Sequence, residues 1–459
     1  MAADFFSPLP VDQGAFDRRK AAHLLRRASF APHEGNLNAA VEQGLEATVD
    51  QLLADNAEQE AAFQQTFDAT AGSLLNVADP SQVQAWWIHR MVHTRSPLRE
   101  KLTLFWHGHF ATSVHKVEGG TLMLRQIDTL RGLAWGSFRE LVLAMARDPA
   151  MLVWLDGESS TREHPNENFA RELMELFTCG IGHYQEQDVR AAARAFTGWH
   201  REGAEFAFHA DDHDFDRKEF LGKSGRFDGG DVIDILMQQP ATPRFIAGKL
   251  LRFFACPQPS EEAVDAAGRL LDQTQLDIKW FLRSLFLSAY FYSDECYRRR
   301  IASPVEFGVG TVRCLGARLP AQELNDHIQA MGQELLAPPN VKGWEGERAW
   351  INSSTWPARR AFAETIGGLF SENAFGPHLP LDQIVPPELD DARDVIDRLA
   401  EVLLQGDLAA AIRDQVVEFL TNTDEGPNAD AFRNDEDFRF TKTRQALALM
   451  LSLPEYQCW

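Results

Sequence analysis

The sequence predicts a mainly α protein, a compact multi-helix body with one short β-hairpin near residues 205–221. Apolar residues recur at spacings of three and four along most of the chain, which is the period of an amphipathic helix. Strand-like alternation is rare, and no stretch approaches about 18 apolar residues, so we expect no membrane span. The expected helices cover residues 21–30, 37–53, 83–92, 97–110, 138–145, 166–177, 189–197, 244–254, 261–271, 278–287, 305–315, 357–370, 392–404, 409–420 and 442–451.

Two of these helices have clear start and end signals. Ser96 and Pro97 favour a start at residue 97, because the hydroxyl can cap the first turn and proline already has a helical φ. Pro165 is placed in the same way before the helix at 166–177, and Gly180 suits its exit as a left-handed cap.

The chain has two candidate breaks, near residues 222–230 and within the proline-rich stretch 376–388. Neither break is a long linker of low complexity. We therefore expect residues 1–459 to form a single helical unit, with sub-boundaries near these two stretches.

Charge and cysteine usage exclude several classes of protein. The chain carries 45 Lys and Arg against 67 Asp and Glu, a net charge of −22, which disfavours binding to nucleic acid or anionic lipid. The chain has five cysteines, an odd number, and they are widely spaced with no CxxC motif. Neither a disulfide framework nor a thiolate zinc site is therefore expected. The N-terminal run lacks a basic segment followed by an apolar one, so we expect a cytoplasmic protein, with export alongside a partner left open.

The first candidate site is the run FWHGHF at the end of the helix at 97–110. His109 lies on the apolar stripe of this helix, whereas His107 points about 200° away from it. Both rings can reach one metal ion only if the helix unwinds at Gly108, and an HxH pair would then supply two nitrogen ligands. The alternative is a hydrogen-bonded His109 in the core and an exposed or interfacial His107.

The second candidate site is the polar side of the helix at 166–177. Glu172 and Glu175 fall within about 60° of each other, and Arg171 borders them. If both sides of this helix are covered, the buried carboxylates need an arginine or a metal ion as a partner. The alternative is a solvated face with salt bridges, which is the more common role of such a pattern.

The predicted hairpin pairs residues 205–209 with 219–221 across an acidic turn. Oxygen donors and imidazoles lie close together in this turn, so it could hold a divalent cation, although it lacks the glycine and the terminal glutamate of an EF-hand. The alternative is an acidic surface turn. The residues concerned are His209, Asp211, Asp212, His213, Asp214, Asp216 and Lys218.

The fourth candidate is the run VKGWEGERAWINSS at residues 341–354. Trp344 and Trp350 could contact a sugar ring or a peptide. Equally, the tryptophans could pack in the core while Ser353 or Ser354 caps the following helix.

Several segments together resemble one bacterial family, the domain of unknown function number eighteen-hundred. The likeness covers nearly the whole chain, and its most specific run is residues 165–189. The resemblance implies a largely helical fold and assigns no reaction. It also implies that relatives are often encoded beside a companion protein of the alkaline-phosphatase superfamily type. The runs that carry it include AAHLLRRASF (21–30), KLTLFWHGHFATS (101–113), PNENFARELMELFTCGIGHYQEQDV (165–189) and PPNVKGWEGERAWINSSTWPARR (338–360).

Two functions are compatible with these observations. The first is a divalent-metal-dependent hydrolase with a polar His/Glu pocket, in which His107, His109 and Glu172 bind the metal ion and activate water. Glu175 or Asp156 would then act as the base, and Arg171 or Lys218 would stabilise an anion. The alternative is a non-catalytic scaffold or binding partner of the companion protein. No GxGxxG, GxxxxGK[ST], GxSxG or HExxH motif is present to favour another enzyme class.

Overall fold

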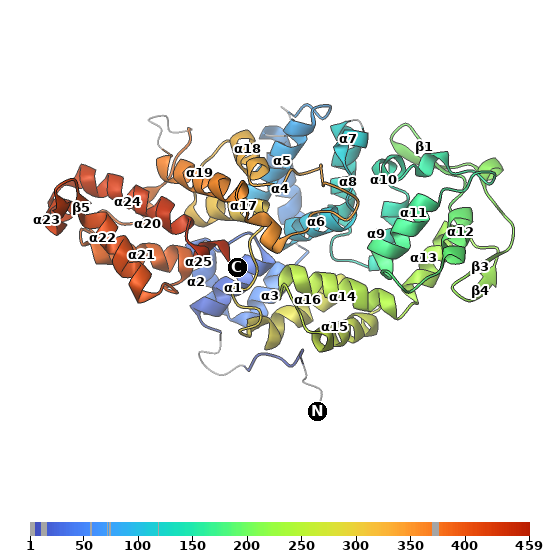
Figure 1. Cartoon of the computed structure of the whole chain (residues 1–459), viewed down its shortest axis with the longest axis horizontal. Coiled ribbons are helices and arrows are strands. Elements are labelled where there is room, and N and C mark those ends of the chain that lie inside the picture. Colours follow the sequence, from blue (N-terminus) through green and yellow to red (C-terminus); the bar gives the residue numbers. More distant parts are fainter. Residues whose placement is uncertain are drawn as a thin grey trace.

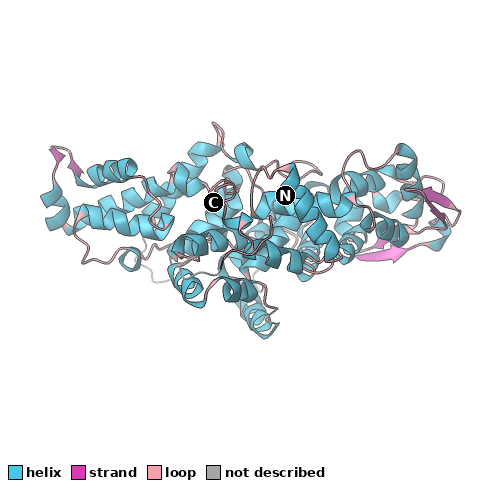
Figure 2. Cartoon of the chain, turned by 90° about the horizontal axis from the view of Figure 1, so that it is seen from below, coloured by secondary structure: helices cyan, strands magenta, loops and turns pink. Residues whose placement is uncertain are grey.

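The computed structural model describes residues 5–10, 16–55, 57–70, 72, 75–117, 119–369 and 376–459. It confirms the mainly α class: helices dominate the described residues, and the strands form short two-stranded antiparallel ladders (Figure 2). None of the helices described is both long and apolar enough to cross a bilayer.

The α-helices follow one another along the chain, and the longest connection, between α12 and α13, contains the strands β1 to β4 (Figure 1). In the first half they are α1 (Arg18–Ala28), α2 (Glu34–Gln43), α3 (Leu45–Leu52), α4 (Ala57–Thr70), α5 (Pro80–His93), α6 (Pro97–His109), α7 (Val114–Val117), α8 (Gly120–Gly132), α9 (Phe138–Ala146), α10 (Pro149–Trp154), α11 (Glu167–Glu172), α12 (Glu186–Ala195) and α13 (Gly229–Met237). In the second half they are α14 (Ala241–Phe254), α15 (Glu261–Gln273), α16 (Ile278–Leu287), α17 (Pro304–Leu315), α18 (Ala321–Ala330), α19 (Thr355–Gly368), α20 (Leu381–Ile384), α21 (Ala392–Leu404), α22 (Ala410–Thr421), α23 (Ala429–Asn434), α24 (Glu436–Leu451) and α25 (Pro454–Gln457).

Shorter elements complete the chain. The 3₁₀ and π turns are η2 (Gly157–Ser159), η3 (Leu173–Thr178), η4 (Ala210–Asp212), η5 (Tyr290–Tyr292) and η6 (Glu347–Trp350). The strands are β1 (Trp199–Glu202), β2 (Glu205–Phe208), β3 (Lys218–Phe220), β4 (Lys223–Gly225), β5 (Asn422–Thr423) and β6 (Gly426–Pro427).

Some helices differ from the expected ranges because of glycine. The helix expected at 37–53 is interrupted at Gly44, which has a φ of 83° and separates α2 from α3. Helices α8 and α13 are among those not expected from the sequence, and both begin with glycine. In α13 the helix is nevertheless fixed by a capping box, in which Asp228 and Asp231 each accept a backbone hydrogen bond from the other residue.

The two strands of the predicted hairpin are present, but each pairs with a different strand. Residues 205–208 pair with β1 and residues 218–220 pair with β4, so two tight hairpins replace the single long one. Turn geometry explains the difference. Gly203 has a φ of 63° in the first turn, and Leu221 and Gly222 both have positive φ in the second, as two-residue hairpin turns require. Adjacent strands therefore close locally, and the acidic run lies between the hairpins.

Two large clusters of buried apolar side chains form the core. One includes Trp106, Phe138 and Phe177, and the other includes Trp87 and Leu104. Helix α6 supplies residues to both clusters, so it lies between them. The sub-boundaries expected near 222–230 and 376–388 stay predictions.

Most of α6 is buried, and its buried charged side chains are paired. The carboxylate of Glu100 accepts hydrogen bonds from Arg90 (2.8 Å), Arg131 (2.6 Å) and the indole of Trp87 (3.0 Å). Burial by itself raises the pKa of Glu100, but the charges of Arg131 and Arg90 outweigh it and lower that pKa to about 2. This cluster connects α5 and α8 to α6.

We expect Glu100→Gln to lower the free energy of unfolding by about 3 kcal/mol, because it leaves two buried guanidinium groups without their shared anion. Urea denaturation at pH 7 measures this change. Since folding lowers the pKa of Glu100 from 4.5 to about 2, its contribution is complete above pH 4.5 and is lost as the pH falls toward 2. The matched control is Glu364→Gln, which removes the exposed pair with Arg360 and should cost less than about 1 kcal/mol. Equal losses in the two variants would contradict this role.

Candidate functional site

The helix expected at 166–177 changes its winding half-way. It begins at α11 with the Asn166 side chain as its cap and continues as a π-helical turn, η3. π turns inside helices occur frequently at functional sites. Here the carbonyl oxygens of Leu176 and Phe177 each accept a hydrogen bond from a side chain of another helix.

Those side chains are Lys249 of α14 and His109 of α6. Nζ of Lys249 donates to the Leu176 oxygen (3.0 Å) and lies 3.0 Å from Nδ1 of His109. Nε2 of His109 lies 3.1 Å from the Phe177 oxygen. Because a carbonyl only accepts, Nε2 carries the ring hydrogen, and Nδ1 therefore accepts the hydrogen bond from Lys249.

This environment shifts the pKa of both groups. Burial, together with the positive charge of Arg252, lowers the pKa of Lys249 to about 7. Burial and the charge of Lys249 lower the pKa of His109 well below its usual value, so the imidazole is neutral. Near neutral pH, Lys249 therefore exists both as an ammonium and as a free amine.

Lys249 lines two cavities, of about 450 and 390 Å³, that meet at the same three residues. We call these two cavities together the lysine cleft. The shared residues are His109, Lys249 and Lys342. The larger cavity is also lined by Glu175, Leu176, Cys179, His183, Arg244 and Phe245, and the smaller one by Arg252, Phe253, Arg300, Trp344, Glu347 and Trp350.

A larger cavity of about 700 Å³ lies elsewhere, between α1, α2, α5 and α17. No carboxylate and no lysine is among the described residues that line it. His93 lines it and burial lowers the pKa of His93 to about 4, but no carboxylate or lysine accompanies this imidazole in the described lining. The lysine cleft combines a carboxylate, an imidazole and a lysine with a lowered pKa, which is typical of an active site.

The lysine cleft includes part of the predicted His/Glu pocket. Glu175 lines the larger cavity, where its Oε2 accepts a hydrogen bond from the Tyr184 hydroxyl (3.1 Å). Glu172 is half-buried, and burial and the charge of Glu175 raise its pKa, while Lys342 acts in the opposite direction. His109 and Glu175, which are 66 positions apart, thus line one cavity, with Glu172 beside it.

His107 is held in a different environment. Its Nε2 accepts a hydrogen bond from the backbone nitrogen of Leu336 (3.1 Å), and its ring contacts Trp87 and Trp344. Burial lowers the pKa of His107 to about 4. Helix α6 continues through Gly108 instead of unwinding there, so the two imidazoles remain on different sides of the helix. The geometry therefore gives no support to one metal ion shared by His107 and His109.

The run at residues 341–354, which we call the tryptophan loop, is packed over the end of α6. A Cβ on Gly343 would lie 2.3 Å from the carbonyl oxygen of Gly108, so glycine is required for this close approach. Trp344 consequently lies against His107, and Trp350 is buried and lines the cleft. Asn352, and not Ser353 or Ser354, caps the next helix through hydrogen bonds from two backbone nitrogens.

Two other predicted residues lie in surface ion pairs. Asp156 pairs with Lys116 (2.8 Å), and Arg171 forms two hydrogen bonds with Glu186 (2.6 and 2.8 Å). Neither Asp156 nor Arg171 lines the lysine cleft. Their predicted catalytic roles stay predictions.

Lys249 and Lys342 were not predicted from the sequence as site residues. The available signal was a single lysine in the otherwise apolar run FIAGKLL of α14. A lysine at such a position is placed close to the core, where burial shifts its pKa.

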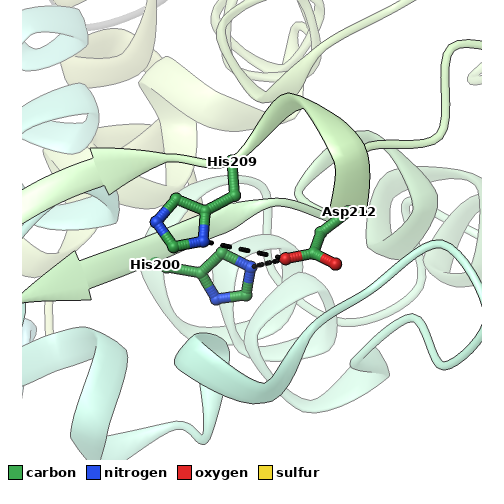
Figure 3. A group of neighbouring side chains, drawn as sticks. All are labelled: His200, His209 and Asp212. Atoms are coloured by element: carbon green, nitrogen blue, oxygen red, sulfur yellow. Dashed lines mark hydrogen bonds and ion pairs between the residues drawn. The ribbon is translucent and has the colours of Figure 1, made fainter.

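One further group of side chains could bind a metal ion. Among the residues that the structure describes, one set of three His, Cys, Asp or Glu side chains has its ligand atoms within 4.8 Å of one another. This set is His200, His209 and Asp212 (Figure 3). The acidic turn, for which the sequence left a cation site and a surface turn open, contributes two of these residues. The third, His200, comes from β1 and was not a candidate from the sequence.

Comparison with known proteins assigns the chain to a family. The family model described as "Protein of unknown function (DUF1800)" matches residues 23–458. The chain belongs to this family. No curated protein and no solved structure matches this DUF1800 chain. The matched range includes the lysine cleft and the tryptophan loop.

We expect Lys249 to react with acetic anhydride at pH 7 faster than any other lysine, because only the free amine is nucleophilic and a usual lysine pKa is about 10.4. Peptide mass spectrometry after brief labelling measures these rates. Lys342 is the internal comparison, because it lines the same cavities. The Lys249 rate should rise with pH through about 7, and a rate still rising steeply above pH 9 would contradict the lowered pKa.

Proposed function

We propose that the lysine cleft is the active site of an enzyme that acts on a small anionic substrate, and that Lys249 transfers the proton. The observation that carries this proposal is the position of the Lys249 amine: it is bonded to the Leu176 carbonyl and to His109 Nδ1, it lines both cavities, and its pKa is about 7. A general base works best when its pKa is close to the working pH.

The bonding around Lys249 explains how it would act as a base. A neutral amine has two N–H groups and one lone pair, and the two acceptors on the protein use both N–H groups. The lone pair is then available to take a proton from the substrate or from an attacking water molecule. Once protonated, the ammonium keeps both hydrogen bonds and has a third hydrogen to return.

The residues that line the cleft favour a substrate with a negative group. Even when Lys249 is neutral, the cleft is lined by four cations and three carboxylates, so its net charge is positive. The cations are Arg244, Arg252, Arg300 and Lys342, and the carboxylates are Glu175, Glu345 and Glu347. Trp344 and Trp350 provide flat apolar surface in the smaller cavity. These features fit a molecule with an anionic end and an apolar or cyclic end.

Hydrolysis, the reaction class predicted from the sequence, requires activation of water. In the proposed site Lys249 supplies this activation in place of a metal ion, and Lys342 stabilises the developing anion. Glu175 lies in the same cavity and would orient the substrate or the water. The metal-ligand roles predicted for His107, His109 and Glu172 stay predictions.

The alternative function, a scaffold or binding partner for a companion of the alkaline-phosphatase superfamily type, also stays a prediction. Co-expression of the two proteins followed by size-exclusion chromatography tests it. Separate elution would contradict it.

We expect Lys249→Met to lower kcat/KM by about 10²–10⁴-fold for any ester or phosphoester that the wild type hydrolyses in a screen of chromogenic anionic substrates. In the wild type, kcat/KM should rise with pH through about 7, because only the neutral amine accepts a proton. The matched control is Lys223→Met, which removes an exposed lysine of β4 and should leave kcat/KM unchanged. Full activity in Lys249→Met would overturn the proposal.

A further inference from the structure

We infer that His200, His209 and Asp212 form a binding site for Zn²⁺, with one coordination position left open for water or a ligand. This site is separate from the proposed function, because none of the three residues lines the lysine cleft. Figure 1 places β1 at the end of the molecule beyond α10, away from α6.

The hairpin register brings the two histidines together. His200 pairs with Ala207, so His209 lies two residues further along the partner strand, as its diagonal neighbour on the same face. The pairing continues past β2, because the His209 nitrogen donates to the Gly198 oxygen (2.8 Å). Gly198 has a φ of 76°, and a Cβ there would lie 2.5 Å from the His209 oxygen. Glycine at this position therefore permits the approach that places His209 over His200.

The distances between the donor atoms suit a tetrahedral ion. Asp212 Oδ2 lies 3.1 Å from His200 Nε2 and 3.7 Å from His209 Nδ1 (Figure 3). Ligands about 2.1 Å from a tetrahedral zinc ion are separated from one another by about 3.4 Å. The two observed separations lie on either side of that value, so small side-chain rotations are enough to surround an ion.

Hydrogen bonds on the outer side of each ring orient the free nitrogens toward Asp212. His200 Nδ1 lies 2.7 Å from the Glu158 carbonyl oxygen, so Nδ1 carries the hydrogen of the neutral ring and Nε2 presents its lone pair to Asp212. His209 Nε2 lies 3.2 Å from Glu202 Oε1, and because a carboxylate accepts, Nε2 carries the ring hydrogen. Nδ1 of His209 then presents its lone pair to Asp212. Metal-binding histidines have outer partners of this kind. Two lone pairs that face one carboxylate oxygen repel it, and a single cation between them removes both repulsions.

The backbone that carries the carboxylate is also held in place. Asp212 ends the 3₁₀ turn η4, and its carbonyl oxygen accepts a hydrogen bond from the Arg162 nitrogen (2.8 Å). His200 is buried, whereas the His209 and Asp212 side chains are 42% and 37% exposed, so an ion can enter from solvent.

The ligand set identifies the class of metal. Two imidazoles and one carboxylate favour Zn²⁺ over Mg²⁺ or Ca²⁺, which prefer oxygen ligands. Three protein ligands leave the fourth tetrahedral position for water, which is the arrangement of a catalytic zinc site.

The test is calorimetric titration of the EDTA-treated and dialysed full chain with Zn²⁺. We expect one tight equivalent in the wild type and an affinity at least about 100-fold lower in His200→Ala and in Asp212→Asn. Glu202→Gln should weaken binding by about 10-fold, because it removes only an outer hydrogen bond. The matched control is His164→Ala, an exposed histidine of the adjacent loop, which should bind Zn²⁺ as the wild type does.

A second measurement separates metal binding from folding. Zn²⁺ should raise the Tm of the wild type and of His164→Ala, and should leave the Tm of Asp212→Asn unchanged, while the metal-free Tm of all three stays similar. The Co²⁺-loaded wild type should show the visible absorption of a tetrahedral site, and His209→Ala should lack it. Equal Zn²⁺ affinity in the wild type and in Asp212→Asn, or absence of a tight equivalent in the wild type, would overturn the inference.

Discussion

The burial of one polar helix is the constraint on which the rest of this structure depends. Helix α6 passes between the two apolar cores, and the side chains of Glu100, Lys101, His107 and His109 have little access to water. Each of them must therefore find a partner on another helix or loop. Glu100 binds arginines of α5 and α8, Lys101 binds Glu306 of α17, His107 binds the loop after α18, and His109 binds η3 and α14. One helix thereby connects most of the elements that surround the lysine cleft.

The same constraint produces two lysines with shifted pKa, and their surroundings give them different roles. Burial lowers the pKa of Lys101 to about 7, as it does for Lys249. Lys101 is completely buried, donates to the Arg26 and Ser29 carbonyl oxygens, and pairs with Glu306 (2.9 Å). Every bonding direction of Lys101 is used inside the protein, so its role is structural. Lys249 has two acceptors on the protein and lines a cleft, so a ligand can reach it.

The two candidate centres rely on different kinds of geometry. In the lysine cleft, a π-helical turn presents two carbonyl oxygens to side chains from helices that are distant in the sequence. In the histidine site, cross-strand register places two rings diagonally on one hairpin, and a following 3₁₀ turn returns a carboxylate to them. The first depends on the packing of the whole helical body, whereas the second is nearly local, within 13 residues of the chain.

The sequence by itself determined the helical class and most helix positions, because apolar period and capping act within a few residues. It also indicated His109 and Glu175, which line one cavity. It did not determine which side of α6 faces which partner, since that depends on α6 remaining helical through Gly108 between two cores. For the same reason it grouped His107 with His109 and missed Lys249. Strand pairing was likewise decided by the positive φ angles at residues 203, 221 and 222, and the turn at Gly203 brought His200 beside His209. The chemical type of each side chain is read directly from the sequence, whereas the contacts between distant side chains are set by long-range packing.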